Sequence, residues 1–218
     1  MMREVNLLDS YPRVKRPIEK IARSTEENRA ISRQFGFEYF DGDRKYGYGG
    51  YYYDGRWKAV ARRMRDYYKL TDSDAVLDVG CAKGFLLHDL KELIPGLQVA
   101  GVDIAEYAIA NVIEDMKPFC KVANATILPF PDKSFDLVIS INTVHNLKRD
   151  DCKQAIQEME RVGRKYKYLQ VDSWFNEKQQ ENLMNWYLTG FTFMSVADWP
   201  EFFTECGYTG DYYWTITE

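Results

Sequence analysis

The stretch Val76-Leu77-Asp78-Val79-Gly80-Cys81-Ala82-Lys83-Gly84-Phe85 decides the fold of this 218-residue chain. Its apolar half predicts a buried strand, its glycines predict a tight turn, and Phe85 opens a helix. Nineteen residues after Gly84, a second apolar strand ends in Asp103. A glycine turn at a helix N-terminus, with an acid at the end of the next strand, predicts a nucleoside-cofactor site in which the carboxylate meets the ribose hydroxyls.

The spacing within the turn separates two classes of cofactor. Dinucleotide sites use G-x-G-x-x-G, which seats a pyrophosphate on the helix N-terminus. This chain has Gly80-x-Ala82-x-Gly84, and Asp78 precedes the first glycine. An acid at that position repels a pyrophosphate but accepts a hydrogen bond from an ammonium group. The pattern therefore favours S-adenosylmethionine and leaves a nicotinamide-dependent oxidoreductase as the weaker alternative.

The turn resembles the glycine-rich segment of class I S-adenosylmethionine-dependent methyltransferases (methyltransferase type 11-like), whose usual form is L-D-x-G-x-G-x-G. Ala82 departs from that form by one methyl group, which restricts the turn but keeps its backbone donors. Residues 124–140 resemble the segment that, in this family, closes over adenine and leads into the fourth strand. Asn124 replaces the usual acid there, and its side-chain oxygen can still accept from the adenine amino group. The resemblance covers about residues 75–171.

The resemblance implies S-adenosyl-L-methionine as cofactor and S-adenosyl-L-homocysteine as product. It places the methionine end at Asp78, Gly80 and Gly84, the ribose at Asp103, and the adenine near Ile104. The cofactor-binding residues predicted in this way are Asp78, Gly80, Cys81, Ala82, Gly84, Asp103, Ile104, Asn124, Ala125 and Asn142.

Strands and helices alternate regularly from residue 75 onward. This order predicts an α/β fold: a Rossmann-like, doubly wound, mostly parallel sheet of the seven-stranded type, with helices on both faces and ligands at the carboxyl ends of the strands. Strands are predicted at 76–79, 97–103, 121–124, 135–141, 166–171 and 211–217, and helices at 105–116, 150–162, 176–189 and 196–206. The family usually ends in two strands, whereas only residues 211–217 qualify here.

The N-terminal third differs in composition. We predict that residues 1–70 form an arm, helices and a lid, and that residues 71–218 form the S-adenosylmethionine-binding domain. A helix is expected within 18–35, starting again near Ser24 or Thr25. Residues 35–57 interleave six glycines with aromatic and charged residues, a composition that argues against a helix and suits a lid over a ligand. The predicted pocket wall is Tyr48, Tyr52, Tyr53, Arg56 and Trp57, with Trp174 after the fifth strand.

This lid segment, F-D-G-D-R…G-Y-G-G-Y…Y-D-G-R-W, also resembles a bacterial methyltransferase subgroup associated with surface-polysaccharide biosynthesis. The resemblance implies a small polar, anionic acceptor such as a sugar or a nucleotide-linked metabolite. Tyrosine-rich loops also occur often where they only pack against the rest of the protein. Residues 35–57 therefore either form a lid over the ligand or have a purely structural role.

One histidine follows the fourth strand and is the predicted catalytic base. His145 would face the transferred methyl group and deprotonate a hydroxyl, which favours O-methylation. The alternative is that it packs beneath the cofactor. Asn142 and Asp172 would end neighbouring strands, but a single carboxylate is a poor magnesium site, so we expect no metal.

Charge and composition bound the remaining possibilities. The net charge is −4, yet residues 1–70 carry 16 basic against 10 acidic residues and the remainder carries 13 against 23. A basic cap fits either an anionic acceptor or simple complementarity with an acidic body, and that body argues against a large nucleic-acid footprint. Four widely spaced cysteines and the lack of a signal peptide or long apolar run predict a cytoplasmic protein with no membrane partner. The sequence leaves the oligomeric state open, and a non-catalytic partner subunit remains an alternative function.

Overall fold

The computed structural model describes residues 2–12 and 23–218. Within them, seven strands form one sheet in the order β1-β7-β6-β5-β2-β3-β4, and every neighbouring pair is parallel. The Rossmann-like, doubly wound fold predicted from the sequence is confirmed. The strands are β1 (Arg3–Glu4), β2 (Ala75–Val79), β3 (Gln98–Asp103), β4 (Cys120–Val122), β5 (Phe135–Ile141), β6 (Gly163–Ser173) and β7 (Asp211–Ile216).

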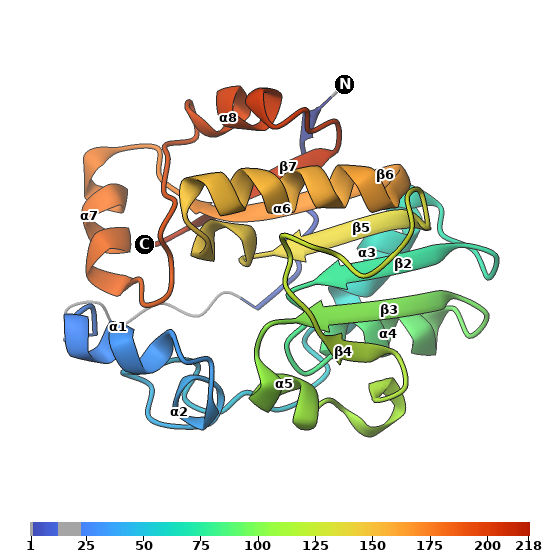
Figure 1. Ribbon diagram of the computed structural model, residues 1–218, viewed down its shortest axis with the longest axis horizontal. Helices are drawn as coiled ribbons and strands as arrows, with labels where there is room; N and C mark the ends of the chain where they lie inside the picture. Colours follow the sequence, from blue (N-terminus) through green and yellow to red (C-terminus); the bar gives the residue numbers. More distant parts are fainter. Residues whose placement is uncertain (1, 13–22) are drawn as a thin grey trace.

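Helices cover both faces of the sheet because its central strands are apolar on both sides (Figure 1). One face packs against α6 (Arg149–Val162) and α8 (Trp199–Glu205), through Ile156, Met159 and Phe203. The other face packs against α3 (Lys58–Tyr68) and α4 (Phe85–Leu93). Because α3 shares a core with α4, residues on both sides of the predicted boundary at residue 70 pack together, and that boundary stays a prediction.

The outer edge of the sheet is built differently from the usual family pattern. The single strand β7 runs parallel to β6, and the N-terminal β1 pairs with its far side. Arg3 fastens this edge by donating from Nε and Nη2 to the carboxylate of Asp211 at 2.9 and 3.1 Å. The abbreviated edge was predicted, but the strand contributed by residues 3–4 was not, because two exposed residues carry no strand pattern.

Four predicted elements need correction. The helix predicted over 105–116 divides into α5 (Glu106–Ala110) and a 3-10 turn (Glu114–Met116), because the backbone N–H of Ile113 donates to Lys83 O beneath the glycine turn. The tyrosine–glycine segment contains one short helix, α2 (Phe37–Phe40), where the sequence argued against any helix. Helices α7 (Glu177–Trp186) and α8 are shorter than predicted.

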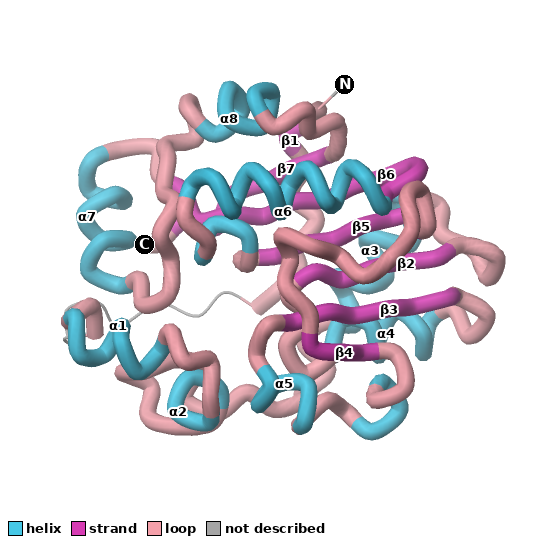
Figure 2. The backbone as a smooth tube through the Cα atoms, in the orientation of Figure 1, coloured by secondary structure: helices cyan, strands magenta, loops and turns pink. Residues whose placement is uncertain are grey.

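The N-terminal segment lies at the carboxyl ends of the strands. Helix α1 (Glu26–Ser32) begins at Thr25, as predicted, and the Thr25 hydroxyl accepts from Asn28 N at 3.1 Å. Of the helix predicted over 18–35, residues 18–22 fall outside the described residues, and the helix ends at Ser32, three residues earlier than predicted. Figures 1 and 2 show α1 and α2 on the side to which the strands point, between α7 and α5. In the described ranges, no helix combines the length and apolarity that crossing a membrane requires.

Candidate active site

The turn after β2 adopts the strained backbone that its glycines predict. Gly80 and Gly84 have φ of 87° and 78°, and Ala82 lies in the same left-handed region at 49°. A Cβ on Gly80 would lie 2.0 Å from Thr143 Oγ1, so this glycine is required by packing as well as by conformation. The close approach brings the turn against the segment that follows β5.

The turn and the end of β3 are joined through Asp103. Its two carboxylate oxygens accept from the backbone N–H groups of Ala82 at 2.8 Å and Ala105 at 2.9 Å. Burial raises the pKa of Asp103, although these backbone donors act against the shift. A carboxylate oxygen can accept more than one hydrogen bond, which is what a ribose diol would require.

Asp78 stands beneath the turn as a second carboxylate. It is buried within β2, and burial together with the nearby charge of Asp103 raises the pKa of Asp78 to about 7. A carboxyl held near neutrality in this way gains from a cation placed beside it, because the cation restores its charged form. Cys81, also predicted at the cofactor, is buried instead: its thiol and that of Cys120 both pack over Gly101.

The N-terminal segment is fastened to the turn by an ion pair. Lys83 donates to both oxygens of Asp41 at 2.8 and 2.6 Å, and Tyr107 donates to the same carboxylate at 2.7 Å. Burial raises the pKa of Asp41, but these donors and Tyr51 N outweigh it and lower the value. No pattern in the sequence indicates this role for Asp41, which lies 42 residues from Lys83.

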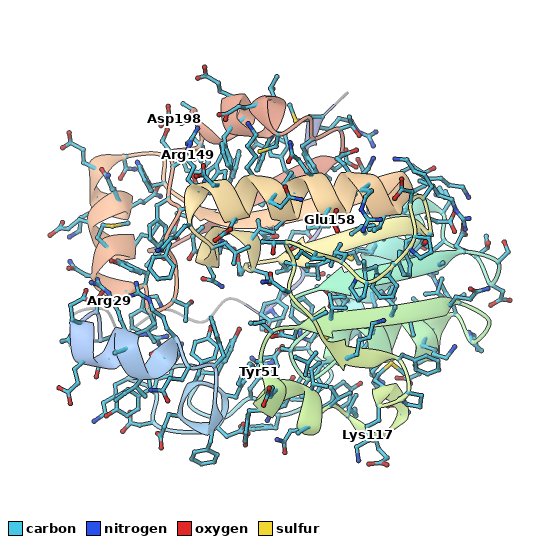
Figure 3. The ribbon with its side chains drawn as sticks, viewed as in Figure 1. Arg29, Tyr51, Lys117, Arg149, Glu158 and Asp198 are labelled. Carbon is cyan, nitrogen blue, oxygen red and sulfur yellow. The ribbon has the colours of Figure 1, made fainter. Side chains whose placement is uncertain are left out.

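Tyr51 is another residue that the sequence analysis missed. Its ring stacks on Phe85 at 5.0 Å, and Tyr48 lies 4.5 Å away on its other side. In Figure 3 Tyr51 lies between the N-terminal segment and α5, on the carboxyl side of the sheet. Because Tyr48, Tyr52 and Tyr53 lie close to Tyr51 in the sequence, the pattern does not indicate which of these rings packs against Phe85.

The residues predicted to contact adenine follow β3 and β4, and most of them are exposed. Ile104 is 54% exposed, and Ile127, which the sequence analysis passed over, is 76% exposed. Asn124 is exposed and its Oδ1 already accepts from Thr126 N at 3.0 Å, so its amide also supports its own turn. Ala125 is half-buried beside it. Apolar side chains left open at this edge suit a flat aromatic base.

A cavity of about 160 Å³ adjoins the segment after β5. It lies between the N-terminal segment, the 3-10 turn Val144–Asn146 and the residues after α7, and it brings together three predicted residues, Asn142, His145 and Tyr48. The Asn142 side chain is fixed there, since its Oδ1 accepts from Thr215 Oγ1 at 2.8 Å. The lining residues that the sequence analysis did not predict include Arg23, Tyr39, Arg44, Asp172, Trp186 and Thr189.

His145 and Asp172 form a pair in this cavity. His145 is 3% exposed, its Nδ1 accepts from the backbone N–H of Asp172 at 3.3 Å, and its Nε2 lies 3.3 Å from Asp172 Oδ2. An imidazole that accepts at Nδ1 carries its neutral-state proton on Nε2, next to the carboxylate. In this tautomer Asp172 contacts both imidazole nitrogens, and the role of His145 as the base stays a prediction.

Five of the predicted pocket residues line other parts of the molecule. Arg56 pairs with Asp54 two residues before it, with both carboxylate oxygens 2.8 Å from its Nε. Tyr53 donates to Asp89 on α4 at 2.6 Å. The remaining three are Tyr52, which is 70% exposed, Trp57, which packs on Tyr11 at 4.6 Å, and Trp174, which is half-buried after β6.

One cluster outside the site has the composition of a metal site. The potential ligand atoms of His88, Asp89 and Glu92 on α4 lie within 4.8 Å of one another. Each residue also has a protein partner: His88 Nδ1 lies 2.7 Å from Asp115, Asp89 accepts from Tyr53, and Glu92 pairs with Lys58. These contacts with neighbouring protein groups explain why the three side chains lie together.

Comparison with known proteins finds relatives of part of the chain. A family model described as a methyltransferase domain matches residues 77–170, from the middle of β2 to the middle of β6. The chain is 33% identical over 104 residues to the mitochondrial arginine-hydroxylase NDUFAF5 of Rattus norvegicus, an alignment that covers 47% of this chain and 29% of that protein. It is 35% identical over 97 residues to ajmaline N-methyltransferase of Rauvolfia serpentina, which covers 40% and 32% respectively. The chain thus spans less than half the length of these curated relatives.

Among solved structures, a SAM-dependent methyltransferase from Aquifex aeolicus superposes with a TM-score of 0.51 at 18% identity, covering 67% of this chain and 78% of that one. Similarity at this level concerns the fold alone.

Proposed function

We propose that this chain, in which residues 77–170 form a class I S-adenosylmethionine-dependent methyltransferase domain, transfers a methyl group to a small polar acceptor bound in the cavity beside His145. S-adenosyl-L-methionine is the cofactor of this domain. The observation that carries the proposal is the contact of Gly80 with Thr143, which places the cofactor turn directly against the segment that bears His145.

The cofactor residues divide by chemistry. Asp103 would accept from the ribose hydroxyls, and Asp78 would pair with the ammonium of the methionine end. Ile104 and Ile127 offer apolar surface for the adenine, with Asn124 and Ala125 beside them. Tyr51, Lys83 and Asp41 would close the methionine end from solvent, because they tie the lid to the turn.

When bound, the cofactor supplies a methyl group already activated on a sulfonium. The work left for the protein is to align the acceptor, exclude water and take up one proton. With a hydroxylated acceptor, the Asp172 carboxylate would take up the hydroxyl proton as the methyl group is transferred. His145 would hold that carboxylate in place. This assignment favours O-methylation of a sugar or a nucleotide-linked metabolite.

The similarity to proteins named arginine-hydroxylase motivates a second outcome to test. The alignment covers 47% of this chain and 29% of that protein, and one fold can carry different chemistries. The third possibility is a subunit that binds the cofactor and transfers nothing. All three are separated by following both the cofactor and the acceptor.

The experiment incubates the protein with S-adenosyl-L-methionine and acceptors from three classes, namely free sugars, sugar phosphates and hydroxy acids. S-adenosyl-L-homocysteine release and acceptor mass are both measured. We expect a gain of one CH₂ in an acceptor, with Asp172→Asn lowering kcat by about 10²–10⁴-fold as loss of a general base does. Asp150→Asn, an exposed acid on α6, is the matched control and should keep full activity. A gain of one oxygen would support hydroxylation, and binding without turnover would support a non-catalytic subunit.

A further inference from the structure

The wall of the cavity contains two arginines from the N-terminal segment. Arg23 is 7% exposed, and its guanidinium carbon lies 4.3 Å from the ring centre of Trp186. Arg44 lies 5.2 Å from the same ring, and both arginines line the cavity together with that tryptophan. The two guanidinium groups therefore share one aromatic support at the edge of the acceptor pocket.

This arrangement is suited to holding a planar or tetrahedral oxyanion. A guanidinium stacked on an aromatic face keeps its N–H groups in the plane of the fork, where they can meet two oxygens of a carboxylate or phosphate. Arg23 is oriented further by donating from Nη1 to the backbone carbonyl of Arg44 at 3.2 Å. Stacking and this hydrogen bond fix the orientation before any ligand arrives, which lowers the entropy lost on binding.

Two further arginines, on α1 and at its end, also lie over aromatic rings, and these contacts restrict the movement of this side of the cavity. Arg29 lies 4.0 Å over the ring of Tyr187, and Arg33 lies 4.0 Å over Phe191. Figure 3 shows Arg29 between α1 and α7. The basic face of the N-terminal segment thus packs along residues 186–191, and the cavity lies within this packed region.

The charges in the cavity set the direction in which an acceptor would bind. Among the described residues that line it, Asp172 is the acidic one, and it lies beside His145. An anionic group is attracted by the arginines and repelled by Asp172. We infer that the acceptor carries a carboxylate or phosphate group held by Arg23 and Arg44, which leaves its methylated atom to Asp172. This inference rests on the proposed function. It assigns the contact with an anionic acceptor to Arg23 and Arg44, whereas the sequence predicted Arg56 at the pocket.

The test uses inorganic phosphate and acetate as probes of the two anion types. The full chain, saturated with S-adenosyl-L-homocysteine, is titrated with each salt by calorimetry at an ionic strength kept constant with chloride. We expect saturable binding of at least one probe, weakened at least tenfold in both Arg23→Gln and Arg44→Gln. Arg23→Lys should recover part of the affinity, and Arg62→Gln, an exposed arginine on α3, should match the wild type. Tighter phosphate indicates a phosphorylated acceptor, and tighter acetate a carboxylate.

Several results would overturn the inference while leaving the proposed function intact. These are a wild type that binds S-adenosyl-L-homocysteine but neither anion, and anion affinities that stay the same in both glutamine variants. If Arg23→Gln fails to fold, Arg44→Gln decides alone, because the Arg44 side chain is exposed at the rim. A wild type that does not bind S-adenosyl-L-homocysteine would instead count against the proposed function.

Discussion

Lys83 Nζ lies 2.8 and 2.6 Å from the two carboxylate oxygens of Asp41, and this ion pair joins the cofactor turn to the N-terminal segment. The Lys83 side chain is 10% exposed and that of Asp41 is 24% exposed, so the pair is largely shielded from water. Tyr107 and the backbone of Tyr51 bind the same carboxylate. One acid from the N-terminal segment thereby holds three groups beside the turn, where we propose that the methionine end of the cofactor binds.

Replacing Asp41 with Asn should loosen the lid. The loss of a shielded charge partner leaves Lys83 without compensation, which we expect to cost about 1–3 kcal/mol. At roughly 2–4 °C per kcal/mol for a chain of this size, the Tm should fall by several degrees. Affinity for S-adenosyl-L-homocysteine should fall about tenfold by calorimetry, which corresponds to 1.4 kcal/mol. Asp43→Asn, an exposed acid in the same segment, is the control, and an equal effect there would contradict the account.

Cofactor binding should depend on pH through Asp78. The pKa of this carboxyl is raised to about 7, so below that pH the ligand's ammonium must displace a proton before pairing with it. We expect affinity for S-adenosyl-L-homocysteine to rise from about pH 6 to pH 8 and to level off above, with proton release detectable by calorimetry in two buffers. Asp78→Asn should bind more weakly at pH 8 and show a flat profile. A wild-type profile without slope would rule out this pairing.

The same raised pKa should destabilise the protein without its cofactor as pH rises. The unfolded carboxyl ionises near pH 4, whereas the folded one holds its proton up to about 7. The contribution of Asp78 to the free energy of unfolding is therefore largest below about pH 4 and is lost progressively up to about pH 7. Urea unfolding across this range should show a negative slope that is smaller in Asp78→Asn. Identical slopes in the two proteins would count against the shift.

The two residues of the turn should respond differently to substitution. Gly80→Ala introduces a Cβ at 2.0 Å from Thr143 Oγ1 on a backbone with φ of 87°, so we expect a large loss of stability and of cofactor binding. Ala82→Gly removes the side chain from a left-handed backbone, whose relief of about 1–2 kcal/mol is offset by the greater entropy of unfolded glycine. Its Tm should therefore stay close to that of the wild type. Thermal denaturation of both variants provides the measurement, and similar losses in the two would refute the argument.

Arg56 should be dispensable for catalysis, contrary to the interpretation of the sequence. It is exposed and pairs with Asp54 in the same turn, so Arg56→Gln should change kcat and KM less than twofold. Steady-state kinetics would check this. A tenfold rise in KM for the acceptor would show that Arg56, rather than Arg23 or Arg44, meets the substrate.

The sequence predicted what local pattern determines. The strand, turn and helix around Gly80 follow from adjacent residues, and Asp103 follows from the next strand. Asp41, Tyr51 and Arg23 could not be predicted, because their roles depend on how a segment without hydrophobic periodicity folds back over the sheet. Arg56 was predicted at the pocket because of its charge, but its guanidinium group already pairs with Asp54, two residues before it. His145 was found from its place after β5, whereas its tautomer depends on the backbone of Asp172, a contact across two strands.

The most direct test of the central claim is calorimetric titration with S-adenosyl-L-homocysteine of the wild type, Asp103→Ala and His145→Gln. We expect micromolar binding by the wild type, loss of binding in Asp103→Ala, whose carboxylate joins the turn to β3, and retention in His145→Gln, which lies in the acceptor cavity. A wild type that fails to bind, or an Asp103→Ala variant that binds as tightly as the wild type, would contradict the assignment of this turn as the cofactor site.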